Sequence, residues 1–167
     1  MEDHFFRIKQ LYDNLKGDST GLFSEILAVS QETGLDKALA LLEKCVIEKR
    51  SAWLEANLLE RDKVDDPLMA GYRWFYENYL HVSLPEDGEI IEHNDKQIIM
   101  RWWNPCPTLD ACVKLGLDTR QVCQKAYHRP VTEFLKTIHP NLRFERNYRC
   151  IRPYTPYCEE IIKLVNK

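Results

Sequence analysis

The residues with the clearest capacity for chemistry are cysteines, and Cys106 comes first because two prolines frame it. The sequence reads Asn104-Pro105-Cys106-Pro107, at the exit of an expected strand and just before an expected helix. The fixed φ angles of the prolines would hold the thiol in one direction. At the N-terminus of the following helix, backbone N–H groups would favour the nucleophilic thiolate. The alternative is that a tight corner of the chain needs only a small apolar residue.

Cys123 and Cys158 are two further thiols that could line a site. Cys123 is expected on a helix close to His128, an imidazole that could transfer a proton. Cys158 is expected at the start of the last strand. If that strand pairs with the one before it, Cys158 would come near Cys150 or Arg146. These residue types would allow a cysteine-lined pocket in which Cys106 is the reactive thiol and His128 or His81 transfers a proton, with a purely structural role as the alternative for each histidine.

An arginine is expected to point into the core beside these thiols. If residues 142–152 form a strand, alternation places one set of side chains on the core-facing side: Leu142, Phe144, Arg146, Tyr148 and Cys150. A buried guanidinium must be paired or must bind an anion, because leaving it unpaired costs several kcal/mol. Arg146 would therefore form an ion pair with Glu92, Glu133 or Glu160, or it would hold the carboxylate of a small ligand.

The same cysteines allow a second kind of site. Cys106, Cys123 and Cys158, with His128 in reserve, could act as thiolate and imidazole ligands of zinc, iron or an iron–sulfur centre. The chain has no CxxC pair of the kind that zinc ribbons use, and it has no Gly-rich phosphate loop, HExxH or GxSxG motif. A metal-binding or small-ligand-binding role without catalysis is the alternative to a hydrolase.

Helices are expected to form the front of the chain. Apolar residues at three- and four-residue steps predict helices over 4–16, from about 20 to a stop at Gly34, and over 36–62, and an aromatic helix over 68–80. The break before that last helix is Asp65-Asp66-Pro67, where proline suits a first turn. The aromatic run could furnish a homodimer interface together with Trp102-Trp103, although helical spacing favours a role in the core.

Strands and further helices are expected after Gly88. Residues 89–93 and 96–103 indicate a β-hairpin, and residues 142–152 and 157–165 indicate two more strands. A helix from about 108 should end at Gly116, and one from 119 to 138 should kink or divide at Pro130. The prediction is an α+β fold with N-terminal helices packed on a mainly antiparallel sheet with intervening helices. Its core should include Leu42, Trp53, Phe75, Ile99, Leu115, Phe134, Phe144 and Ile162.

Length and charge limit the class of protein. The chain has 167 residues, 23 basic and 26 acidic, so its formal charge is −3. The balance argues against nucleic-acid binding, and no apolar run approaches the roughly 18 residues of a membrane span. We expect one domain over 1–167, with an acidic helical part (1–87) and a cysteine-bearing sheet part (88–167). Without a secretory signal pattern, a cytoplasmic location is expected, where the six cysteines would stay unpaired.

Several short segments between residues 98 and 165 resemble the L-2-amino-thiazoline-4-carboxylic acid hydrolase-like family. They are Cys106-Pro107, Ala111, Leu115-Gly116-Leu117-Asp118, Cys123, Pro140-Asn141-Leu142-Arg143-Phe144-Glu145-Arg146 and Cys158. The family usually has a Gly-Asp pair shortly before the last cysteine, whereas this chain has Tyr154-Thr155-Pro156-Tyr157. A similar layout of cysteines is found in the 4-vinyl reductase domain, where they resemble metal ligands.

The resemblance implies a hydrolase of a non-peptide C–N bond in a cyclic amidine or thiazoline carboxylate. Cys106 would be the nucleophile or would orient water, and His128 would carry a proton. Arg146, Cys123 and Cys158 would bind the carboxylate-bearing ligand, and no cofactor would be required. In the metal-binding alternative, the cofactor would be zinc, iron or an iron–sulfur centre.

Overall fold

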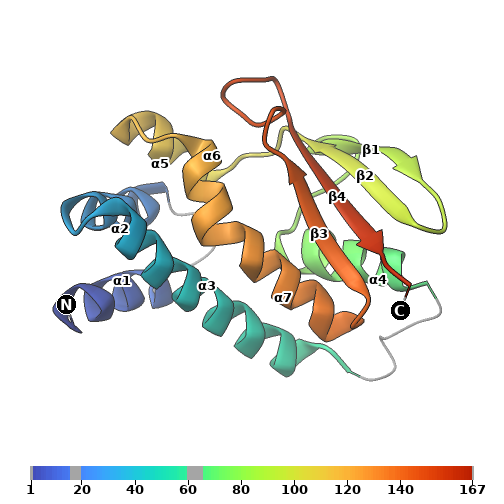
Figure 1. The fold of residues 1–167 in the computed structure, drawn as a ribbon, viewed down its shortest axis with the longest axis horizontal. Coiled ribbons are helices and arrows are strands. Elements are labelled where there is room, and N and C mark those ends of the chain that lie inside the picture. The colour runs from blue at the N-terminus through green and yellow to red at the C-terminus, as the bar shows by residue number, and fades with distance from the viewer. Residues whose placement is uncertain (1, 16–19, 60–65, 167) are drawn as a thin grey trace. The chain divides into compact units, whose positions relative to one another are not determined.

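The computed structural model describes residues 2–15, 20–59 and 66–166, and it has the α+β class that the sequence predicts. The chain forms two compact units (Figure 1). Unit 1 consists of residues 1–50 and 106–130, and unit 2 consists of residues 51–105 and 131–167. Each unit therefore combines part of the acidic front of the sequence with part of its basic back. The expectation of one domain over the whole chain stays a prediction.

Unit 1 is helical and has a core of its own. Its elements are α1 (Glu2–Asp13), α2 (Thr20–Glu32), most of α3 (Leu35–Asn57), α5 (Pro107–Leu115), α6 (Thr119–Val122) and the π-helix η3 (Cys123–Tyr127). Side chains that are fully buried in this core include Ile8, Ile26, Leu39, Leu42 and Val122. α1 ends at Asp13 and α3 ends at Asn57, before the predicted ends at residues 16 and 62. A tighter turn, in which the amide of Leu15 bonds to the Tyr12 carbonyl, follows α1, and the Asn57 side chain bonds to the Trp53 carbonyl at the end of α3.

The ends of the later helices are where the sequence predicts them. Gly116 ends α5 with a φ of 66°, a left-handed conformation that glycine adopts without strain. Asp118 caps α6 by accepting a hydrogen bond from the backbone N–H of Arg120. Asp66 caps α4 (Pro67–Tyr72) in the same way, with Pro67 in the first turn. Turn chemistry that can be read from local sequence therefore sets these boundaries.

The run from 119 to 138 divides into segments, as expected, with the irregularity just before Pro130. η3 occupies Cys123–Tyr127 and α7 follows over His128–Ile138. Pro130 lies in the first turn of α7 and has no N–H to donate to the preceding turn. The π-helical turn of η3 includes the residues to which an N–H at position 130 would donate in a regular α-helix.

Unit 2 contains the sheet. Its strands are β1 (Gly88–His93), β2 (Gln97–Trp102), β3 (Leu142–Asn147) and β4 (Cys158–Leu164), in the order β1-β2-β4-β3 with every neighbouring pair antiparallel. α4 contacts β3 and β4, and the π-helix η2 (Arg73–Tyr79) follows it. Figure 1 shows β4 lying between β2 and β3. The last strand of the chain is thus central in the sheet.

One face of the sheet is buried. The strands differ from the sequence prediction at two points, the face on which Ile99 lies and the residue at which β3 ends. The buried face carries Ile98, Met100, Phe144 and Ile162. The prediction of Ile99 in the core was wrong, because Ile98 and Met100 alternate inward and Ile99 is half-buried on the other face. β3 ends at Asn147 rather than at 152, because the amide of Cys150 closes a turn onto the carbonyl of Asn147.

The remaining predicted core residues are mostly buried. Leu42, Phe75, Phe134, Phe144 and Ile162 are buried, whereas Trp53 and Leu115 are only partly so. The aromatic run belongs to the core of unit 2, with Tyr72, Phe75, Tyr76 and Trp102 all less than 4% exposed. The homodimer stays a prediction. Across the described residues, the helices are too short or too polar to span a membrane.

Gly88 provides a test of the sheet geometry. A Cβ atom at this position would lie 2.4 Å from both the carbonyl oxygen of Arg101 and the Trp102 ring. Gly88→Ala should therefore lower the free energy of unfolding by about 1–3 kcal/mol, measured by urea denaturation. Gly21→Ala is the control, because a Cβ there meets nothing within 4 Å. Equal stability of Gly88→Ala and the wild type would contradict the described contact.

Candidate functional site

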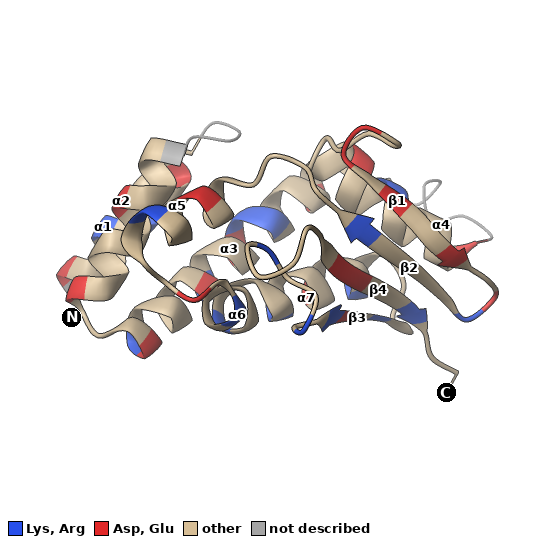
Figure 2. Ribbon diagram, turned by 90° about the horizontal axis from the view of Figure 1, so that it is seen from above, with Lys and Arg blue, Asp and Glu red and all other residues tan. Residues whose placement is uncertain are grey.

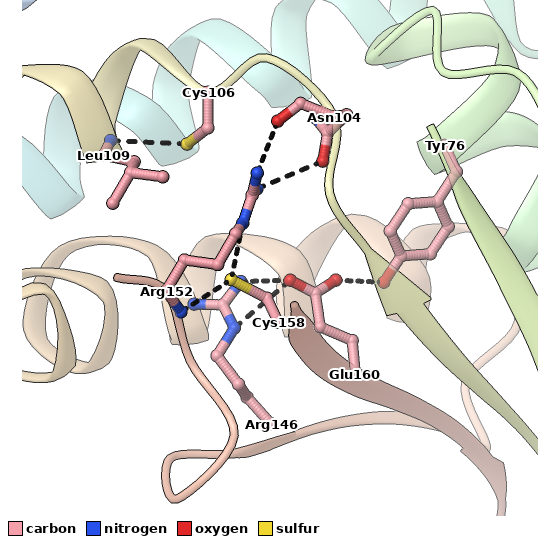
Figure 3. A network of polar contacts seen from close by, with 8 residues as sticks. All are labelled: Tyr76, Asn104, Cys106, Leu109, Arg146, Arg152, Cys158 and Glu160. Atoms are coloured by element: carbon pink, nitrogen blue, oxygen red, sulfur yellow. Dashed lines mark hydrogen bonds and ion pairs between the residues drawn. The ribbon is translucent and has the colours of Figure 1, made fainter. Parts of the chain in front are cut away.

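A buried network of polar side chains lies on the core face of the sheet in unit 2. Glu160 Oε1 accepts hydrogen bonds from Arg146 Nη2 at 2.6 Å and from Arg146 Nε at 3.2 Å (Figure 3). The Tyr76 hydroxyl donates a hydrogen bond to the other carboxylate oxygen, Oε2, at 2.5 Å. The side chains of Arg146 and Glu160 are each 10% exposed. The carboxylate is thus held from two sides, which a buried charge requires.

The fold positions these three groups through strand register and an irregular helix. β3 and β4 pair Arg146 directly with Glu160, so both side chains point to the same face. Tyr76 comes from η2 and its ring stacks on Trp102 at a centroid distance of 4.7 Å. Burial, and then the Glu160 carboxylate, raise the pKa of Tyr76 well above its usual value. The phenol therefore stays protonated and donates to Glu160.

The neighbouring glutamate, Glu159, points to the opposite face of the sheet. Its carboxylate accepts hydrogen bonds from Arg101 Nε and from Asn147 Nδ2, each at 3.1 Å, and the Tyr157 ring lies 4.5 Å from the Arg101 guanidinium carbon. Figure 2 shows the acidic start of β4 between basic segments of β2 and β3. Both faces at this end of the sheet are therefore organised around a paired carboxylate.

Cys158 lies at the start of β4, two residues before Glu160. Its Sγ accepts hydrogen bonds from the backbone N–H of Arg152 at 3.4 Å and from Arg152 Nε at 3.5 Å. The same guanidinium donates to the Asn104 carbonyl at 2.7 Å and to Asn104 Oδ1 at 3.4 Å (Figure 3). A half-buried thiol thus meets a cation in a water-accessible setting. Cysteine nucleophiles are found in such electropositive, partly exposed surroundings.

The residues predicted as the catalytic pair belong to unit 1. Cys106 is the N-cap of α5, and its Sγ accepts a hydrogen bond from the backbone N–H of Leu109 at 3.4 Å. The sulfur therefore meets the helix N-terminus, as the Pro-Cys-Pro sequence suggests, and it also has a capping role. Cys123 begins η3 and His128 begins α7, both half-buried.

Two other cysteines of unit 1 are core residues. Cys45 and Cys112 are 2% and 0% exposed. Burial raises the pKa of the Cys45 thiol to about 11 and that of the Cys112 thiol to about 12. Both groups are therefore neutral over the physiological range and behave as small apolar side chains.

The structure brings only some of the predicted site residues together. Arg146 and Cys158 share unit 2, where Arg146 forms the ion pair with Glu160 that was one of the predicted alternatives. Cys106, Cys123 and His128 belong to unit 1. Over the described parts of the chain, no group of three or more His, Cys, Asp or Glu side chains could hold a metal ion. The prediction of a metal site at Cys106, Cys123 and Cys158 thus gains no support.

Three residues of the network have no clear signal in the sequence. Tyr76 is one of several aromatics in its run, and Arg152 is one of four arginines at three-residue steps. Asn104 stands out only as a neighbour of Pro105. Their roles depend on tertiary contacts, since Tyr76 reaches Glu160 and Asn104 reaches Arg152 across long stretches of chain.

The buried carboxylate can be tested by its effect on stability. Glu160→Gln should lower the free energy of unfolding by about 3–5 kcal/mol, because it removes the negative charge that two nitrogens of the buried Arg146 contact. Glu145→Gln is the matched control: Glu145 pairs with Lys163 across the same two strands, but its side chain is 50% exposed. The control should lose at most about 1 kcal/mol in urea denaturation. Equal losses in the two variants would show that the Glu160 pair does not carry this stability.

The buried thiol of Cys112 predicts a loss of stability in alkali. An unfolded thiol releases its proton above about pH 9, whereas folded Cys112 keeps it to about pH 12, so the folded state binds more protons between these values. The free energy of unfolding should therefore fall with rising pH in that window, by up to about 1.4 kcal/mol per pH unit for this group.

The measurement is urea denaturation at pH 9, 10 and 11. Cys112→Ala should show a shallower decline than the wild type. Val113→Ala, which changes an exposed side chain of the same helix, should show the wild-type decline. If the slopes of Cys112→Ala and the wild type coincide, the thiol does not contribute to the alkaline loss.

Comparisons with known proteins found no counterpart for this chain. No family model matches its sequence, no curated protein matches it, and no solved structure matches its fold. The resemblance to the thiazoline carboxylate hydrolase-like family stays a prediction, and function must be inferred from the chemistry of the described residues.

Proposed function

We propose that the protein is a small-molecule hydrolase that opens a C–N bond of a cyclic amidine or thiazoline carboxylate, and that its reactive thiol is Cys158. The observation that carries this proposal is the contact of the Cys158 sulfur with both the backbone N–H and the guanidinium of Arg152. A thiolate is the nucleophilic form of cysteine, and N–H donors aimed at the sulfur stabilise negative charge there.

Cys158 suits this role better than the other thiols for structural reasons. Cys45 and Cys112 are buried and neutral. Cys106 already caps α5 through its sulfur. Cys158 is half-buried, next to a cation, and on the same face of β4 as a carboxylate that Tyr76 and Arg146 fix in place.

Arg152 is the proposed anchor for the carboxylate of the substrate. Arg146 directs two of its nitrogens to Glu160 and is largely buried. The contact of Arg152 with the Asn104 carbonyl is short, at 2.7 Å, whereas its contacts with Asn104 Oδ1 and with Cys158 Sγ are long, at 3.4 and 3.5 Å. A ligand carboxylate could replace the long contact to Asn104 Oδ1 and gain a charge-assisted hydrogen bond. This places the acid group of the ligand beside the thiol.

The reaction proceeds in two balanced steps. The Cys158 sulfur adds to the amidine carbon, and the thiol proton goes to the ring nitrogen. The ring C–N bond then breaks, the exocyclic amino group becomes an imine, and the proton that it loses passes to the released nitrogen. Water then adds to the same carbon, the sulfur leaves, and a proton from water restores the thiol. The net change is the addition of one water molecule to give S-carbamoyl cysteine, because the ring sulfur stays bonded to the carbamoyl carbon. Glu160, Tyr76 and Arg146 act as positioning residues that fix the start of β4.

The test uses the full chain with 2-aminothiazoline-4-carboxylate, following the carbamoyl product by mass. The wild type should turn over, and Cys158→Ser should not. Cys106→Ser is the matched control, because serine is itself a good N-cap and should preserve α5. Arg152→Lys should weaken substrate binding by about 1.5–3 kcal/mol, seen mainly in KM.

Each other outcome has a definite meaning. Turnover that survives in Cys158→Ser and disappears in Cys106→Ser would move the nucleophile to Cys106. A thermal shift with carboxylate ligands but no turnover would show a sensor or carrier. Absence of both in the wild type would overturn the proposal.

A further inference from the structure

Cys150 lies in the connection between β3 and β4, three residues after the end of β3, and Cys158 is the first residue of β4. Both are half-buried free cysteines. The backbone N–H of Glu159 donates to the carbonyl of Cys150 at 2.9 Å, so the main chains on either side of the connection are adjacent at these residues. The start of β4 therefore lies beside the segment of the connection that contains Cys150.

The Cys158 sulfur points toward the segment that contains Cys150. It lies 3.4 Å from the backbone nitrogen of Arg152, which is two residues beyond Cys150. The donor N–H belongs to the peptide unit that joins Cys158 to Glu159, and the acceptor carbonyl belongs to Cys150, so the Cα atoms of the two cysteines lie within roughly 8 Å of each other. Disulfides span Cα separations of about 4.4–6.8 Å. The two cysteines are therefore close enough to be bridged by a small adjustment of the connection.

We propose that Cys150 and Cys158 form a reversible disulfide when the protein meets a low-molecular-weight disulfide. The Cys158 thiolate attacks one sulfur of the reagent, forms a mixed disulfide and releases one thiolate. The Cys150 thiolate then attacks the Cys158 sulfur and releases the second thiolate. Two protein thiols are oxidised, one reagent disulfide is reduced to two thiols, and the two thiol protons pass to the released thiolates or to solvent.

Arg152 makes an anionic disulfide the favoured reagent. Its guanidinium is at the Cys158 sulfur, so it attracts a carboxylate-bearing reagent to the thiol that reacts first. The disulfide itself requires no enzymatic activity. Its consequence for catalysis rests on the proposed function: the bridge would remove the reactive thiol, and a thiol reductant would restore it.

The experiment treats the folded full chain with one equivalent of dithiobis(nitrobenzoate), an anionic aromatic disulfide. Remaining thiols are then alkylated in denaturant and the chain is cut with trypsin. Arg152 precedes Pro153, so cleavage after Arg149 and Lys163 leaves both cysteines in one peptide, residues 150–163. The wild-type peptide should be unalkylated, free of the aryl group and lighter by two hydrogens, with two aryl thiolates released per bridge.

Two variants and one condition complete the test. Cys150→Ser should retain the aryl group on Cys158 and release a single thiolate, and Cys106→Ser should match the wild type. Closure should be slower in urea, because the fold brings the two segments together. A wild-type peptide that keeps the aryl group or is alkylated at both cysteines overturns the proposal. The mass readout is independent of turnover, so failure here and failure of the hydrolase proposal are distinguishable.

Discussion

The buried ion pair between Arg146 and Glu160 is the interaction on which the polar end of unit 2 depends. A carboxylate and a guanidinium removed from water are tolerated only when each has well-placed partners. The pair obtains them from strand register, which sets Arg146 opposite Glu160, and from Tyr76 on η2. The relative placement of β3, β4 and η2 is therefore constrained by one carboxylate. The same constraint fixes the position of Cys158, because Cys158 lies two residues before Glu160 on the same face of β4.

The two consecutive glutamates of β4 show how alternation can serve two surfaces. Glu160 is 7% exposed as a residue and is paired within the core, whereas Glu159 is paired with Arg101 on the other face. Each carboxylate has an arginine on an adjacent strand, Arg146 on β3 and Arg101 on β2. A slip of one residue in this register would exchange the two faces and leave both arginines mispaired. The charges thus help to specify the register as well as to stabilise it.

The sequence predicts elements better than it predicts their partners. The helix start at Pro67 and the stop at Gly116 depend on local chemistry, and they appear where the sequence places them. The hairpin and the two later strands follow from alternation. Whether Ile98 or Ile99 faces the core depends on pairing with β4, which apolar pattern alone does not settle, since both residues are isoleucine.

The candidate site shows the same division. The inward direction of Arg146 follows from alternation, and Glu160 is among its three predicted partners. Tyr76, Asn104 and Arg152 could not be assigned, because their contacts join segments that are distant in sequence or lie in an irregular connection. Cys106 was predicted at a helix N-terminus and is found there, but its sulfur bonds to the backbone of its own helix. Local sequence can place a reactive group without revealing what it will touch.

The central position of β4 has a consequence for biosynthesis. β2 emerges from the ribosome long before β4, with residues 106–130 of unit 1 and then α7 and β3 between them. Until β4 has emerged, one edge of β2 has no strand to pair with, and its apolar residues have an incomplete sheet to pack in. Residues 106–130, the second segment of unit 1, are synthesised before β3 and β4. The helical unit can therefore fold while the sheet is still incomplete. The nascent chain is therefore most prone to aggregation in the interval between completion of unit 1 and the emergence of β4.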